Sequence, residues 1–398
     1  MDNEQLEKKI VNLNSLNMPF NVGVSRPSDF IAKNMSYGQC HSYEAKKFPL
    51  KIYLGDLTYD TVAISTNAFP LNIGYIGSFC MARFGPDIEV VLFKYINDLQ
   101  GAIKKTPPDI LGLSNYCWNQ NLGIEMFRVL RKINPYALTV WGGPNFPKDR
   151  LSQEKWLIQF PEVDIYVPLE AEVGFSNILG CAQEARDVKR IRQTLLRKAV
   201  DGCIVRGSDG KFHYGEPVKR IEDLDKIPSP YLSGILDKFF DSRLLPVIQT
   251  NRGCPFNCTY CVDGSGEVNK INKFSLERVA AEIKYIAERV PKNIHALTIT
   301  DLNFGMLPRD LQICDAIHNA QQKYNYPLYI GASTGKNSRK NIINAIKCLK
   351  GSLELMVAVQ SMDAQVLKNI NRENISVERM LELAPAIKES GLRTKAEI

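Results

Sequence analysis

The chain has 398 residues, of which 44% are hydrophobic and 23% charged, and its formal net charge is +7. This composition excludes a disordered or fibrous protein, and the length leaves room for roughly two or three domains. The positive excess is mild and spread through both halves, so we expect neither a nucleic-acid nor a membrane partner. Ten cysteines without a secretory signal favour a cytoplasmic protein with reduced thiols or a metal site over a disulfide framework.

The first half of the chain alternates between short apolar runs and helical periods. Residues 1–47 lack a sustained period and are assigned to an N-terminal extension. The strands predicted for residues 48–181 are 51–54, 88–93, 110–114, 138–141 and 163–167, and the helices between and after them are 70–83, 96–104, 122–132 and 170–181. Such alternation predicts an α/β domain with a doubly wound parallel sheet, whose ligands lie beyond the carboxyl ends of the strands.

The second half repeats this alternation after a connector at residues 182–242, in which a hairpin is expected around Gly207 and Gly210. Within residues 243–398 the predicted strands are 245–249, 296–301, 328–332, 354–359 and 392–398, and the helices are 276–290, 309–323, 341–349 and 377–390. Four strand–helix units and a fifth strand predict a partial (β/α) barrel of the TIM type, truncated after its fifth strand. A last strand with an unpaired edge leads us to expect that the chain is incomplete.

Three cysteines with the spacing C-x3-C-x2-C, Cys254, Cys258 and Cys261, follow the first strand of this second alternation. Three thiolates so close together can hold three corners of an iron–sulfur cluster, and the remaining iron is then free to bind a substrate or cofactor. The alternatives are small buried apolar residues or a zinc knuckle. Zinc would need a fourth ligand nearby, and the next Cys or His, His295, lies far downstream.

The cysteine loop resembles that of the radical S-adenosylmethionine (SAM) superfamily, in which this motif carries a 4Fe-4S cluster. The further residues that the resemblance implies for SAM binding are Tyr260 near the adenine, Asp301, Asn303 and Phe304 at the methionine amino group, Gln360 and Ser361 at the ribose, and Arg372 in the basic element just after. Each of these segments has an alternative interpretation. Residues 301–305 fit an ordinary turn, and Ser361 or Asp363 could cap the following helix.

Two strand ends of the first half carry polar or small residues. Paired glycines, Gly142 and Gly143, let a ligand approach the backbone, and the Ser114 hydroxyl can hydrogen-bond a nitrogen heterocycle. This arrangement resembles the cobalamin-binding domain, with Tyr116 where that family has Leu. The family's Asp-x-His-x-x-Gly motif is absent, so the resemblance implies no histidine ligand to cobalt from this domain. The alternative is a domain that only packs against the barrel, in which the two glycines form a turn.

Residues 48–398 together are similar to cobalamin-binding radical SAM proteins. The resemblance implies an enzyme that cleaves SAM to a 5'-deoxyadenosyl radical and uses cobalamin to methylate an unactivated atom. The small-molecule or peptide substrate is not identified by the sequence, and flavodoxin or ferredoxin is the expected reducing partner. The alternatives are a cobalamin-independent radical SAM enzyme, such as a methylthiotransferase or an enzyme of rearrangement or ring formation, and a non-catalytic cobalamin or redox sensor.

Overall fold

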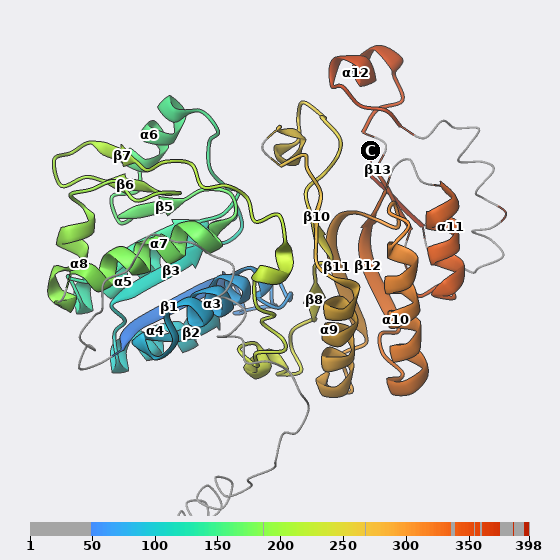
Figure 1. Cartoon of the computed structure of the whole chain (residues 1–398), viewed down its shortest axis with the longest axis horizontal. Coiled ribbons are helices and arrows are strands. Elements are labelled where there is room, and N and C mark those ends of the chain that lie inside the picture. The colour runs from blue at the N-terminus through green and yellow to red at the C-terminus, as the bar shows by residue number, and fades with distance from the viewer. Residues whose placement is uncertain are drawn as a thin grey trace, which may run out of the picture. The chain divides into compact units, whose positions relative to one another are not determined.

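The computed structural model describes residues 49–185, 187–266, 268–335, 339–353, 355–358, 360–374, 385 and 394–397 (Figure 1). All of them belong to one compact unit. The short 3-10 helices are Gly85–Asp87, Leu224–Lys226, Asp237–Phe239 and Val262–Gly264. No helix in the described part of the chain is long and apolar enough to cross a membrane.

The first half forms a seven-stranded sheet in the order β2-β1-β3-β4-β5-β6-β7 (Figure 1). Its strands are β1 (Leu50–Thr58), β2 (Ile88–Tyr95), β3 (Ile110–Ser114), β4 (Leu138–Gly142), β5 (Ile165–Val167), β6 (Ile204–Arg206) and β7 (Phe212–Tyr214). Its helices are α3 (Leu71–Phe84), α4 (Ile96–Lys105), α5 (Gln120–Ile133), α6 (Arg150–Ile158), α7 (Ala171–Glu184) and α8 (Val188–Leu195). The strands and helices predicted between residues 48 and 181 are all present, and α6 is an additional helix.

Both faces of the first sheet are buried, because side chains alternate along each strand. On β1, Ile52 and Leu54 pack into the core with α3 and α7, whereas Tyr53 and Leu57 pack into a second core with α4 and α5. Strands β1 to β5 pair in parallel. The doubly wound arrangement predicted from the sequence is therefore confirmed for these five strands.

The last two strands of the sheet correct the prediction of a wholly parallel sheet. The hairpin expected between residues 182 and 242 is present as β6 and β7, but it pairs antiparallel with β5 and so extends the first sheet. Its turn uses Gly210 at a φ of 82°. Short polar-flanked strands of three residues give no periodic pattern, which is why the sequence did not place them in this sheet.

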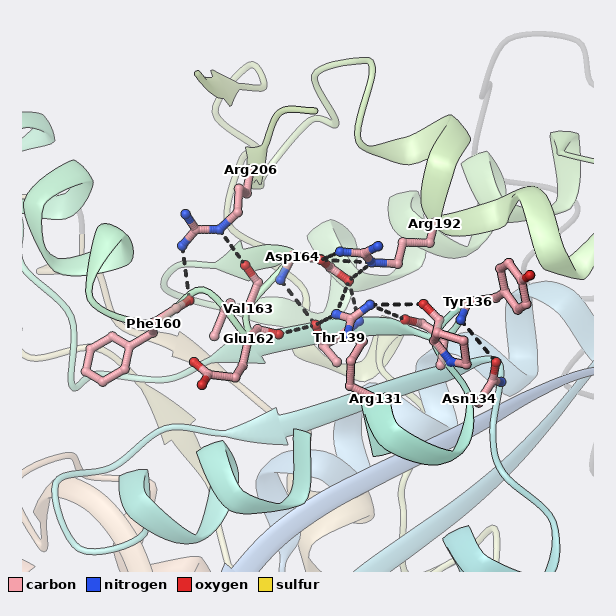
Figure 2. Close-up of polar contacts among 12 residues, drawn as sticks. Arg131, Asn134, Tyr136, Thr139, Phe160, Glu162, Val163, Asp164, Arg192 and Arg206 are labelled. Atoms are coloured by element: carbon pink, nitrogen blue, oxygen red, sulfur yellow. Dashed lines mark hydrogen bonds and ion pairs between the residues drawn. The ribbon is translucent and has the colours of Figure 1, made fainter. Parts of the chain in front are cut away.

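A buried carboxylate fastens two helices to the amino-terminal end of this sheet (Figure 2). The side chain of Asp164, just before β5, is fully buried. It accepts hydrogen bonds at 2.9 Å from Arg131 of α5 and from Arg192 of α8, and at 3.1 Å from the backbone N–H of Thr139. Nearby, Arg206 donates to the carbonyl of Val163 at 3.1 Å. This end of the sheet is therefore closed by its own side chains.

The second half contains parallel strands separated by helices, as predicted. The strands are β8 (Val247–Ile248), β11 (Ala296–Phe304), β12 (Tyr329–Thr334), β13 (Leu355–Ala358) and β14 (Thr394–Glu397). The helices are α9 (Leu276–Arg289), α10 (Asp310–Tyr324), α11 (Arg339–Cys348) and α12 (Ala364–Asn369). Strand β11 pairs in parallel with β8 and β12, β13 pairs with β14, and a parallel bridge joins Ile330 to Leu353. The predicted helix 377–390 lies outside the described residues, apart from Pro385.

Replacing Asp164 tests its role in fastening α5 and α8. Asp164→Asn removes the charge but keeps one acceptor oxygen. We expect the free energy of unfolding, measured by urea denaturation, to fall by about 2 kcal/mol, because bonds to charged groups are worth about 1.5–3 kcal/mol and both arginines are partly solvated. As a control, Glu154→Gln breaks the exposed pair with Arg150 and should change stability by about 0.5 kcal/mol or less. Equal losses in the two variants would contradict this role.

Candidate active site

The carboxyl ends of β1, β2 and β3 carry a buried polar cluster. The strand order changes direction between β1 and β3, which is where doubly wound sheets open a ligand crevice. Here the ammonium group of Lys94 lies 2.9 Å from Asp56, and the Ser114 hydroxyl donates to the same carboxylate at 2.5 Å. The Asn119 amide donates to the Ser114 oxygen at 3.0 Å. The serine predicted to bind a ligand is thus held by its own neighbours.

Sequence reasoning missed Asp56 and Lys94. Lys94 is 2% exposed. A lysine inside the otherwise apolar run of β2 was the feature of the sequence that could have indicated a buried ion pair. Lysine is almost never fully buried unless it is paired, so this position needed a carboxylate on a neighbouring strand. The register of β1 and β2 shows why that partner is Asp56.

The remaining predicted residues of the first half lie beside Ser114. The backbone N–H of Asn115 donates to the carbonyl of Gly142 at 2.6 Å, which joins the ends of β3 and β4. Gly143 has a φ of 137°, and a Cβ there would lie 2.5 Å from the Asn115 carbonyl oxygen. Close backbone packing thus accounts for Gly143 without a ligand. The ring of Tyr116 stacks on Trp118 at 4.5 Å, and Trp118 remains 47% exposed at this edge.

The cysteine loop, residues 253–271, connects two short strands that pair antiparallel, β9 (Asn251–Arg252) and β10 (Asn272–Lys273). Two glycines permit its close backbone packing. Gly253 has a φ of 108°, and a Cβ there would lie 2.3 Å from the Lys270 carbonyl oxygen. A Cβ on Gly264 would lie equally near the Cys258 carbonyl oxygen. The backbone of the loop therefore packs closely against itself at both glycines.

The three cysteines of this loop differ in burial. Cys254 and Cys258 are buried and Cys261 is half-buried, and no disulfide joins any of the nine cysteines in the described residues. In the same residues no three Cys, His, Asp or Glu side chains are gathered closely enough to hold a metal ion as they stand. The amide of Asn303 donates to the Cys254 sulfur at 3.3 Å. The donor chemistry thus fits an iron–sulfur cluster, which the thiols would close around.

Asp301, predicted near the methionine amino group, faces inward. Its carboxylate accepts from the backbone N–H and hydroxyl of Thr250 and from the backbone N–H and amide of Asn251. Burial raises its pKa to about 7, although these four donors favour the charged form. Phe304 is also buried, within the core. Of the predicted segment, Asn303 contacts the cysteine loop, Asp301 bonds the two residues that lead into it, and Phe304 lies in the core.

The segment after β13 packs directly on the cysteine loop. The backbone N–H of Thr259 donates to the carbonyl of Ile370 at 3.1 Å. Arg372 donates to the Tyr260 hydroxyl at 2.6 Å, and Asn374 donates to the carbonyl of Ser361 at 2.7 Å. A hollow of about 180 Å³ lies between residues 255–258 and 371–373. The structure thus brings together the predicted residues Tyr260, Ser361 and Arg372 around one network.

The two alternative roles in this segment divide between two residues. The carboxylate of Asp363 caps α12, since it accepts from the backbone N–H of Val366 at 2.8 Å. Ser361 does not cap the helix directly but accepts from the backbone N–H of Asp363 at 3.1 Å. Gln360, predicted beside Ser361, is exposed and has a φ of 64°.

The carboxyl ends of β1 to β5 and the loops that follow them are named here the ligand edge of the first sheet, after the ligand that the sequence predicts there. This edge contacts the cysteine loop. The loop after β4 contains Lys148, whose ammonium group donates to the carbonyl of Val262 at 3.2 Å, one residue beyond the last cysteine. This bond joins the loop after β4 to the backbone just after the last cysteine.

Comparison with known proteins gives two kinds of match. The model of the radical SAM superfamily matches residues 248–398. The chain is 32% identical to the 2-(S-pantetheinyl)-carbapenam-3-carboxylate methyltransferase of Streptantibioticus cattleyicolor, with 79% of this chain and 45% of that enzyme covered. It is 29% identical to the cobalamin-dependent radical SAM methyltransferase TokK of Streptomyces tokunonensis, with 73% and 42% covered. The chain therefore spans less than half the length of these two relatives.

Solved structures share the fold. The cobalamin-dependent SAM radical enzyme OxsB, with aqua-cobalamin and SAM bound, matches 88% of this chain and 49% of its own with a TM-score of 0.64 and 17% identity. The radical SAM methyltransferase TsrM from Kitasatospora setae, with cobalamin and a [4Fe-4S] cluster bound, matches 88% of this chain and 69% of its own with a TM-score of 0.64 and 14% identity. The α/β fold with parallel sheets is therefore common to these proteins.

Replacing Gly253 tests the tight packing of the cysteine loop. We expect Gly253→Ala to lower the free energy of unfolding by about 1–3 kcal/mol, because the alanine must adopt a strained φ and its Cβ meets the Lys270 carbonyl. Gly266→Ala in the same loop is the control, since a Cβ there meets nothing within 4 Å, and its effect should stay within about 0.5 kcal/mol. Equal effects in thermal or urea unfolding would show that the loop is not constrained at Gly253.

The buried carboxyl of Asp301 predicts a pH dependence of stability. Its pKa rises from 3.8 to about 7 on folding, so between these values the folded protein binds more protons than the unfolded chain. Stability should therefore fall as the pH rises through this range, by up to about 1.4 kcal/mol per pH unit. Asp301→Asn should remove this contribution. Urea denaturation across the range checks it, and identical slopes in the two proteins would refute it.

Proposed function

The chain belongs to the radical SAM superfamily, among members that carry a cobalamin-binding type of domain before the radical SAM core, and we propose that it is a cobalamin-dependent radical SAM methyltransferase. Its substrate would be a small molecule or peptide with an unactivated atom to methylate. The observation that carries this proposal is the C-x3-C-x2-C loop held on the β9–β10 ladder, in contact with the ligand edge of the first sheet.

Three cysteines, Cys254, Cys258 and Cys261, would hold the cluster and leave one iron open. When bound, the cluster supplies the electron that cleaves SAM to a 5'-deoxyadenosyl radical. The chain's own contribution is to hold the sulfurs and to restrict access to them. The Asn303 amide, aimed at the Cys254 sulfur, would stabilise negative charge there.

Of the residues that would hold SAM, Arg372 lines the hollow beside Cys258 and is bonded to Tyr260. Arg372 is 6% exposed, and its guanidinium already bonds Tyr260 and Asn374, so it presents a fixed positive charge at this hollow. Tyr260 is half exposed and offers a ring face to the adenine. Gln360 and Ser361 are proposed to bond the ribose hydroxyls, since Ser361 is linked through Asn374 to Arg372. Asp301 would act through Thr250 and Asn251 rather than by direct contact, because its carboxylate points at them.

Cobalamin would lie at the carboxyl edge of the first sheet. The stacked pair Tyr116 and Trp118 offers an exposed aromatic face there, beside the closely packed strand ends at Gly142 and Gly143. Ser114 could bond the nucleotide tail of cobalamin by turning its hydroxyl away from Asp56. The chain has no histidine between residues 50 and 167, so the cobalt would lack a histidine ligand from this sheet.

The finer features of the fold are also proposals. The parallel succession β8, β11, β12, β13 and β14 supports a partial (β/α)6 barrel in residues 243–398, and the first sheet supports a Rossmann-like cobalamin domain. Pairing of β6 and β7 with that sheet favours extending its domain from residue 181 to Tyr214. Flavodoxin or ferredoxin as electron donor and a cytoplasmic location remain predictions; oxygen-sensitive cluster chemistry and reduced thiols favour the latter.

Anaerobic reconstitution with iron, sulfide and hydroxocobalamin tests the proposal. After desalting, the wild-type chain should retain about four irons and about one cobalt. Ala at Cys254, Cys258 or Cys261 should remove the iron and SAM cleavage but leave the cobalt, whereas Cys348→Ala, a half-buried thiol elsewhere, should change neither. Gly143→Val should remove cobalt but leave iron, because its side chain would strike the backbone of Asn115.

Other outcomes of this experiment identify the alternatives. Iron without cobalt in the wild-type chain would indicate a cobalamin-independent radical SAM enzyme. Both metals without SAM cleavage under a strong reductant would indicate a sensor. Iron retained in all three cysteine variants would overturn the cluster assignment itself.

A further inference from the structure

The base of the cysteine loop carries a nearly buried arginine that faces the first sheet. Arg252 ends β9, two residues before Cys254. Its guanidinium donates to Glu172 at 2.7 Å and to Gln249 at 2.9 Å, and it lies over the ring of Tyr75, 5.0 Å from the centroid. The side chains of Arg252 and Glu172 are only 11% and 5% exposed. This ion pair joins the first half of the chain to the second away from solvent.

A second arginine makes a parallel link to the other side of the same ladder. Arg220 donates to Glu170 at 2.8 Å and to the carbonyl oxygen of Lys270 at 2.9 Å. That carbonyl oxygen is the one against which Gly253 packs. The chain on both sides of the cysteine loop, before Cys254 and after it, is therefore tied to adjacent acidic residues of one segment.

That acidic segment lies at the ligand edge of the first sheet. Glu170 and Glu172 flank the start of α7, the helix that follows the carboxyl end of β5. A helix N-terminus favours negative charge, so Glu172 is stable there and available to the arginine. The link therefore runs from the edge proposed for cobalamin to the backbone that bears the proposed cluster.

We propose that Arg252 and Glu172, together with Arg220 and Glu170, are positioning residues that fix the distance and orientation between the cysteine loop and the ligand edge of the first sheet. This role rests on the proposed function, because the separation matters only if both sites hold a cofactor. Removing one partner of a buried ion pair is costly, so the pair resists relative movement of its two elements. Methyl transfer between two bound groups needs such fixed geometry, since small misplacements reduce rates strongly.

The chain offers a matched control for a variant at Glu172. Glu282 and Arg278 form an ion pair of similar burial, 2% and 9% exposed with the nitrogen and oxygen 3.0 Å apart, but both residues lie on α9. Glu282→Gln therefore removes a carboxylate at a similar depth and leaves the Arg252–Glu172 pair itself in place; its partner Arg278 also lies over Tyr75, at 6.0 Å from the centroid, so the control retains that ring contact as well. Glu172→Gln keeps the shape of the side chain and one acceptor oxygen, which makes it a mild change.

The first measurement uses the cofactor-free full chain. Hydrogen–deuterium exchange should show amides of residues 251–273 and 168–176 exchanging at least about tenfold faster in Glu172→Gln than in the wild type, because a charge-assisted bond is lost. Glu282→Gln should leave both segments at the wild-type rate. Unchanged exchange in Glu172→Gln, or equal changes in both variants, would show that the Arg252–Glu172 pair does not hold the two segments together.

The second measurement uses protein loaded with both cofactors. Pulsed electron paramagnetic resonance reports the distance between cob(II)alamin and the reduced cluster. We expect a broadened or displaced distance distribution in Glu172→Gln, partial recovery of the wild-type distribution in Arg252→Lys relative to Arg252→Ala, and a wild-type distribution in Glu282→Gln. A wild-type distribution in Glu172→Gln would overturn the positioning role. Loss of cobalt from the wild-type chain would instead refute the proposed function. The exchange experiment would still test whether the Arg252–Glu172 pair holds the two segments together.

Discussion

The cysteine loop stands on the two-residue ladder between β9 and β10, and the rest of the candidate site is arranged around that ladder. Asp301 binds the chain immediately before and within β9, through Thr250 and Asn251. Arg252 ties the same strand to α7, and residues 370 and 371 bond the loop itself. A ladder this short has little stability of its own. Its geometry therefore depends on side chains from the elements that pack around it.

The two ends of the first sheet differ in how their polar and aromatic groups are arranged. At the amino-terminal end, the carboxylate of Asp164 is bonded by Arg131 and Arg192, so its charge is neutralised by the protein itself (Figure 2). At the carboxyl end, Lys94 and Asp56 form a buried pair under Ser114, while Trp118 remains half exposed. Burying a lysine is expensive unless it is paired, so this pair forms a rigid polar floor. The contrast supports a ligand at the carboxyl end alone.

The sequence predicted the parallel strands and their helices because long apolar periods control both. It missed the pairing of β6 and β7 with the first sheet and the β9–β10 ladder, since strands of two or three residues carry no period. Motif spacing located Cys254, Tyr260 and Arg372, but it could not show that Arg372 bonds Tyr260 across more than a hundred residues. Nor could it show that Asp301 points inward, because a side chain's direction depends on packing between distant segments.

Burial separates the predicted site residues into a buried group and an exposed group. Asp301 and Phe304 are buried, and Asp301 bonds the backbone that leads into the loop. Tyr260 and Gln360 are exposed at the same end of the fold. Gln360 has a φ of 64°, an uncommon conformation for a residue other than glycine, whereas the positive φ of Asn371 is the ordinary left-handed end of α12, where asparagine is favoured. The unusual backbone conformation among the exposed site residues is therefore at Gln360, directly beside the proposed ribose residue Ser361.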